Sequence, residues 1–261
     1  MKLHIVPSSQ GVQWVRLGVK TFIRQPLALG GLFFLFMGVV SVLSIVPLLG
    51  TALSLLILPA ASLGLINAAR LASTGSFPLP VTLIAAFTAG AAKRSAMLQL
   101  GVLYTAAFLA IIGVTMLIDG GQFSSVYLMG APLTEDMAAN GHFISALWAA
   151  LLLYIPMAAV FWHAPALVFW HDVTPGKSLF FSAMACWRNK GAMLMFILTW
   201  MAVITGAGVV ITLLAGLLGG AAVINMLLMP ATMVMAAMFF ASIYFTYQDS
   251  FDGTHLVDTK A

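Results

Sequence analysis

The chain has 261 residues, of which 62% are hydrophobic and only 7% charged, and its mean hydropathy is +1.08. Soluble domains carry about 25% charged residues, so this composition excludes a soluble enzyme, a disordered chain and a secreted disulfide scaffold. Because Cys186 is the only cysteine, an internal disulfide and a thiolate metal cluster are also excluded. The sequence predicts an all-α polytopic membrane protein.

Six apolar stretches are long enough to cross a bilayer, since a helix needs about 20 apolar residues to do so. Residues 27–69 and 191–248 contain no charged residue, and each can form a hairpin of two spans, with turns at residues 47–50 and 216–220. We predict a single integral membrane domain, 1–261. It has an interfacial helix at 10–25 and spans at about 27–46, 51–69, 97–118, 143–163, 193–215 and 221–246.

The positive charges predict the orientation of these spans. With six crossings, all 11 lysines and arginines fall on one side of the membrane, whereas Asp119, Glu135 and Asp136 fall on the other. Cytoplasmic loops of membrane proteins are rich in Lys and Arg, so we expect cytoplasmic N- and C-termini. Because this topology explains the net charge of +4, no nucleic-acid partner is expected.

Residues 10–25 have the pattern of an amphipathic helix. Arg16, Lys20 and Arg24 recur every four positions on one face. A second face is apolar and consists of Val12, Val15, Val19, Phe22 and Ile23. Helices of this kind lie in the membrane interface, and we expect the three basic residues to bind membrane lipids.

Three basic segments each border an apolar hairpin, and Pro59, Pro156 and Pro230 each lie in the second helix of a hairpin. We interpret this as three copies of one unit, made of an interfacial helix, a span, a turn and a kinked span. The alternative is the alternation of basic and apolar stretches that any six-helix protein shows. A proline frees the carbonyl four residues earlier, which must not face lipid. We therefore expect all three prolines to face the bundle interior.

The densest polar cluster is residues 161–172, in which Phe-Trp-His occurs twice, and its candidate functional residues are His163, His171 and Asp172. Two histidines and an aspartate are suited to a metal site or a proton relay. However, eight helical residues rise about 12 Å, and Pro165 interrupts the helix. The pattern is more typical of a Trp and His belt at the membrane interface, and we predict no metal and no cofactor.

The residues that follow carry a family resemblance. The motif begins with Ala164-Pro165-x-Leu167-Val168. It continues with the acidic residue Asp172 and then with Ser178, Ser182, Trp187 and Asn189. This segment resembles uncharacterised bacterial six-helix inner-membrane proteins, which are similar to the membrane domain of some glycerophosphoryl diester phosphodiesterases. The resemblance implies a multi-pass protein of the bacterial inner membrane without an established activity, and it supplies no catalytic residue.

Polar groups that could carry chemistry are scarce. No charged residue lies within a predicted span, whereas ion-coupled transporters usually bury at least one, and no phosphate-binding loop or HExxH motif is present. The sequence favours a non-enzymatic scaffold, assembly factor or lipid-binding accessory protein, with membrane lipids and other inner-membrane proteins as partners. The alternative is a small permease or channel for an apolar or amphiphilic solute.

Overall fold

The computed structural model describes residues 2–46, 48–218 and 220–252, and all regular elements in this part of the chain are helices. Six helical stretches of the described residues are long and apolar enough to cross a membrane. They are α2 (Pro26–Leu43), α3 (Leu49–Ser73), α5 (Ala91–Asp119), α8 (Gly141–Phe161) continued by α9 (Ala164–His171), α11 (Lys190–Leu218) and α12 (Ala221–Tyr247). The chain is an all-α polytopic membrane protein, as predicted.

Shorter helices precede, connect or follow these spans. They are α1 (Gln10–Arg24), η1 (Pro80–Ile84), α4 (Ala85–Thr88), α6 (Gln122–Met129), α7 (Glu135–Ala139), α10 (Pro175–Arg188) and η2 (Gln248–Asp252). Each of the two predicted hairpin turns contains a residue, Pro47 or Gly219, that lies outside the described residues. Several helices extend beyond the predicted spans, and α5 begins before Lys93 and Arg94, whose long side chains can reach polar headgroups from a helix end.

The chain divides into two compact units, and the helices α2 and α3 contribute to both. The first unit consists of the described residues of 1–36, 62–84 and 185–261, and the second of 37–61 and 85–184. Each unit is described by itself below. The single domain expected over the whole chain stays a prediction.

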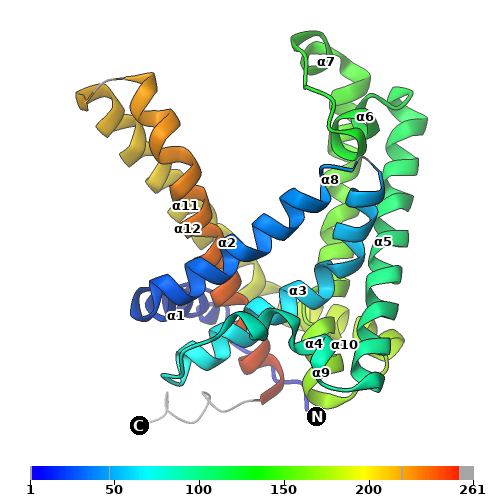
Figure 1. The fold of residues 1–261 in the computed structure, drawn as a ribbon, viewed down its shortest axis with the longest axis vertical. Coiled ribbons are helices and arrows are strands. Elements are labelled where there is room, and N and C mark those ends of the chain that lie inside the picture. Colours follow the sequence, from blue (N-terminus) through cyan, green and yellow to red (C-terminus); the bar gives the residue numbers. More distant parts are fainter. Residues whose placement is uncertain (1, 47, 219, 253–261) are drawn as a thin grey trace. The chain divides into compact units, whose positions relative to one another are not determined.

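In the first unit, α1 packs against both α11 and α12, which run side by side (Figure 1). Two glycines on α1 make this close approach feasible. A Cβ atom at Gly18 would lie 2.6 Å from the Ser242 Cα atom on α12, and one at Gly11 would overlap the Ala192 carbonyl oxygen on α11. Because neither position has room for a side chain, the backbone of α1 lies directly on the two spans.

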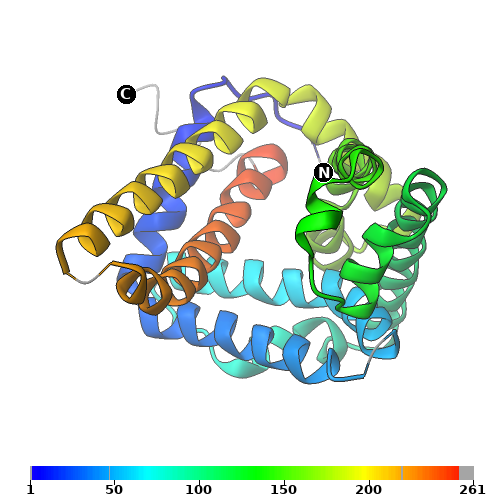
Figure 2. The same cartoon turned by 90° about the horizontal axis from the view of Figure 1, so that it is seen from above.

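In the second unit, α5 and α8 form the central pair, and they lie alongside each other in Figures 1 and 2. The Tyr104 ring of α5 meets the Phe161 ring of α8 edge to face, with 5.1 Å between the ring centroids. At the far end of α5, the Asp119 carboxylate accepts the backbone N–H groups of Gly121 and Phe123, at 2.8 and 2.6 Å. Asp119 therefore caps the start of α6, because the first N–H groups of a helix have no partner within it.

Candidate functional site

The three basic residues of α1 lie on its exposed side. Arg16, Lys20 and Arg24 are all exposed, whereas the side that contacts α11 and α12 is apolar or small. The buried residues of α1 are Gly11, Trp14, Val15, Gly18, Thr21 and Phe22. The contact with the two spans therefore leaves the three basic side chains free to meet another partner.

The apolar face expected for α1 is divided between two environments. Val15 and Phe22 are buried, but Val12 and Ile23 are 39% and 65% exposed. The five apolar residues share one side of α1, but the protein covers just part of that side, because the close-packed Gly18 side determines which face contacts the spans. At roughly 100° per residue, Val12 and Ile23 lie between the buried face and the basic row. The exposed part of α1 is thus itself amphipathic.

The segment before α1 is held by one side chain, that of Asn189 between α10 and α11. Its Oδ1 atom accepts the Val6 N–H at 3.0 Å, and its Nδ2 group donates to the His4 carbonyl at 3.1 Å and to Ser250 Oγ at 3.3 Å. The His4 N–H in turn donates to the Ser250 carbonyl at 2.9 Å. The segment before α1 and the η2 turn after α12 therefore lie together.

Asp249 is a buried carboxyl group that the sequence analysis missed. It lies in η2, a π-helical turn that continues α12, and it is 2% exposed. Its Oδ2 atom accepts the Gln10 side-chain amide at 2.6 Å and the Trp14 indole N–H at 2.7 Å, both from α1. The predicted span ended at residue 246, just short of this residue. A signal was present, because a Trp on a buried face needs an acceptor for its N–H.

The fourth span is broken between α8 and α9, and a serine from α10 fills the break. In a continuous helix the His163 N–H would donate to the Ala159 carbonyl. Instead the His163 N–H donates to Ser182 Oγ at 2.9 Å, and this hydroxyl donates to the Ala159 carbonyl at 2.8 Å. A side chain inserted in this way is a known cause of helix kinks. Two residues later, Pro165 has no N–H and cannot donate to the Phe161 carbonyl, so the helix does not close there either.

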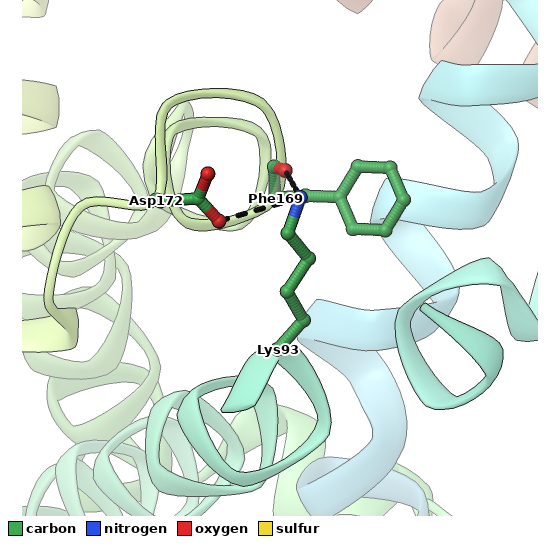
Figure 3. Close-up of polar contacts among 3 residues, drawn as sticks. All are labelled: Lys93, Phe169 and Asp172. Carbon is green, nitrogen blue, oxygen red and sulfur yellow. Dashed lines mark hydrogen bonds and ion pairs between the residues drawn. The ribbon is translucent and has the colours of Figure 1, made fainter. Parts of the chain in front are cut away.

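The end of α9 is held by Lys93 of α5 (Figure 3). The Lys93 ammonium donates to the Phe169 carbonyl at 2.7 Å, lies 4.9 Å from the centroid of the Phe169 ring, and pairs with Asp172 Oδ1 at 3.3 Å. The last carbonyls of a helix have no partner within it and attract cations. Lys93 therefore caps α9, and the candidate Asp172, whose side chain is 74% exposed, supports this cap.

The two candidate histidines are at opposite ends of α9. His163 precedes its first residue and is 1% exposed, whereas His171 is its last residue and is partly buried. Among the residues that the structure describes, no three His, Cys, Asp or Glu side chains gather as metal ligands would. Within residues 161–172, the His163 N–H, the Phe169 carbonyl and the Asp172 carboxylate have the partners described above, and these contacts hold α9 against α10 and α5.

The three prolines do not share one environment. The helices α3, α8 and α12 continue through Pro59, Pro156 and Pro230, and the predicted kinks stay a prediction. Pro59 is buried, whereas Pro156 and Pro230 are exposed, and the orientation of the three prolines towards the bundle interior stays a prediction. In α8 the buried side includes Met157, and the adjacent Pro156 points about 100° away from it. The three prolines thus differ in burial, and the three-copy interpretation and the proline-lined binding site stay predictions.

A comparison with known proteins gives the family. A probable inner membrane protein of Burkholderia thailandensis is 38% identical to this chain over 254 residues, which cover 96% of this chain and 94% of that protein. No family model matches the chain, and no solved structure matches it. The similarity extends over almost the full length of both chains and includes all six candidate spans. The chain therefore belongs to the same family of multi-pass inner-membrane proteins.

Proposed function

We propose that this protein is a non-enzymatic membrane scaffold or accessory protein that binds anionic lipid headgroups through α1. The observation that carries the proposal is the exposure of Arg16, Lys20 and Arg24 on a helix whose other side is packed on two membrane spans. Each basic residue near an anionic surface contributes about 1 kcal/mol of attraction. Three such residues together correspond to roughly a 150-fold gain in affinity.

The exposed apolar residues of α1 support the same function. Val12 and Ile23 lie beside the basic row, so an α1 at the membrane surface can direct apolar side chains towards acyl chains and basic ones towards phosphates. The cytoplasmic leaflet is the anionic one. The proposal therefore includes cytoplasmic termini, which the one-sided distribution of lysine and arginine also favours.

A non-enzymatic role is supported by what the buried polar groups do. Ser182, Asn189 and Asp249 form bonds that hold segments of the chain together. Burial raises the pKa of the Cys186 thiol to about 12, so this thiol is a poor nucleophile at neutral pH. We also propose that residues 164–189 are related to the membrane domain of glycerophosphoryl diester phosphodiesterases, which they resemble. Within that segment, Ser182 and Asn189 have structural partners rather than catalytic ones.

The lipid that remains bound after purification tests the proposal. The wild type and the triple variant R16Q/K20Q/R24Q are extracted in mild detergent and exchanged into nanodiscs that contain equal amounts of anionic phosphatidylglycerol and neutral phosphatidylcholine. Native mass spectrometry then counts the lipids of each class that stay on the protein. We expect the triple variant to lose phosphatidylglycerol and to keep phosphatidylcholine.

The matched control, R94Q/K177Q/R188Q, removes the same number of positive charges, two from Arg and one from Lys, at exposed positions of α5 and α10. It should retain phosphatidylglycerol at the wild-type level. An equal loss in both triple variants would mean that net charge alone attracts lipid. Wild-type retention by the α1 variant would reject the proposed function.

A further inference from the structure

A single carboxyl group connects α1 to the end of the last span. Asp249 is 2% exposed, and one of its oxygens accepts hydrogen bonds from both Gln10 and Trp14. A buried carboxyl group is unfavourable unless it is hydrogen-bonded, and both of these bonds come from side chains of α1. Here the two donors lie four residues apart and therefore on the same side of α1.

The direction of these bonds is linked to the direction of the basic row. At roughly 100° per residue, Arg16 lies about 160° around the helix axis from Trp14. Fixing the Trp14 indole on Asp249 therefore fixes Arg16 on the other side of α1, where it is exposed. The two bonds at Gln10 and Trp14 oppose rotation of α1 about its own axis, and they add to the close packing at Gly11 and Gly18.

We propose that Asp249 is a positioning residue, which holds α1 in the rotation that presents its basic residues to anionic lipid. This inference rests on the proposed function of α1. Asp249 does not touch the lipid itself, since its oxygen is buried against Gln10 and Trp14. The π-helical turn that carries it is a rare element, which occurs frequently at functional sites.

The adjacent clamp has a different task. Asn189 and Ser250 hold the backbone of the segment before α1, at His4 and Val6, and the bonds given for Asn189 do not reach α1. Loss of this clamp should free the segment before α1 without changing how α1 is rotated. Asn189→Ala is therefore a matched control for variants of Asp249.

Two substitutions of Asp249 separate positioning from folding. D249L removes the acceptor oxygen, whereas D249N keeps one oxygen for the Trp14 indole. We expect D249L to lose phosphatidylglycerol by the same factor as R16Q/K20Q/R24Q, and D249N and N189A to stay within twofold of the wild type. In D249L combined with the triple variant, no further loss is expected, because residues that act through one another are not additive.

The orientation of α1 at the membrane can also be measured directly, without counting lipids. A spin label at the exposed residue Gln13, in a C186A background, reports immersion depth through its accessibility to oxygen and to a water-soluble nickel complex. D249L should change the ratio of the two accessibilities, to oxygen and to the nickel complex, and D249N should not. Should D249L fail to fold, W14F removes the indole donor while it keeps an aromatic ring, and the same outcomes apply.

The outcomes of the two proposals are distinct. If the triple variant loses lipid but D249L and W14F retain it, the lipid site on α1 stands and the positioning role of Asp249 is overturned. If D249N loses as much lipid as D249L, the acceptor oxygen is not what orients α1, and the inference is also overturned. If the triple variant itself retains lipid, the proposed function fails first.

Discussion

The bridge that Ser182 makes between the two halves of the fourth span can be tested by Ser182→Ala. The variant removes two hydrogen bonds, one from the His163 N–H and one to the Ala159 carbonyl. A net hydrogen bond in a folded protein contributes about 0.5–1.5 kcal/mol. The free energy of unfolding should therefore fall by about 1–3 kcal/mol. In a chain of this size each kcal/mol lowers the melting temperature by roughly 2–4 °C.

Ser178→Ala is the matched control for this experiment. Both serines belong to α10 and both are 0% exposed. The Ser178 hydroxyl, however, donates within its own helix, to the Pro175 carbonyl at 2.7 Å. Its loss removes one local bond and leaves the break between α8 and α9 unchanged. We therefore expect S182A to lower the melting temperature about twice as much as S178A.

The buried Cys186 provides the assay, because it is the only cysteine and reacts with a thiol-specific fluorescent dye once the protein unfolds. A temperature ramp in detergent gives the melting temperature of each variant. S182A and S178A melting at the same temperature would refute the reasoning, since the bridge would then contribute nothing beyond a local bond.

Three other contacts can be tested by substitution or by labelling. Lys93→Met should destabilise the protein by about 1.5–3 kcal/mol, because it removes a charge-assisted bond to the Phe169 carbonyl. Asp172→Asn should cost less than about 1 kcal/mol, since that carboxylate is largely exposed. Denaturant titration compares the two variants. Gly18→Ala should lower the free energy of unfolding by about 1–3 kcal/mol through overlap with Ser242. Gly31→Ala, which has open space around it, should leave the stability unchanged, and thermal unfolding compares the two variants. The native Cys186 thiol should resist the dye at pH 7–8, because burial raises its pKa to about 12; rapid labelling before unfolding would contradict this.

The parts of the fold that follow from local pattern were predictable. Uncharged stretches of sufficient length can only be spans, so the six candidate helices were expected, and the four-residue spacing of Arg16, Lys20 and Arg24 placed them on one side of α1. Which side of α1 contacts the protein was not predictable from hydropathy. It depends on Gly18, whose missing side chain admits Ser242 from a helix more than two hundred residues later in the chain.

The polar contacts were harder to predict for a related reason. Ser182 and Asn189 were recognised as motif residues, but their partners lie on other segments of the chain. Asp249 was missed because the apolar run before it ends only at Gln248, and a π-helical turn has no hydropathy signature. Pro156 and Pro230 were assigned to the interior from one argument alone, namely that the carbonyl four residues before each proline loses its hydrogen bond. That rule does not say which side of a helix its neighbours cover.

The clamp around His4 and Val6 also constrains the order in which the protein assembles during synthesis. Val6 and Asn189 are 183 residues apart in the chain, and ribosomes add about 5–20 residues per second. The segment before α1 is therefore synthesised about 10–40 s before Asn189, and Ser250 follows later still. During that interval α1 has neither α11 nor α12 to cover Trp14. The apolar side of α1 can be buried at the membrane surface during this time. The clamp closes when the last hairpin is complete.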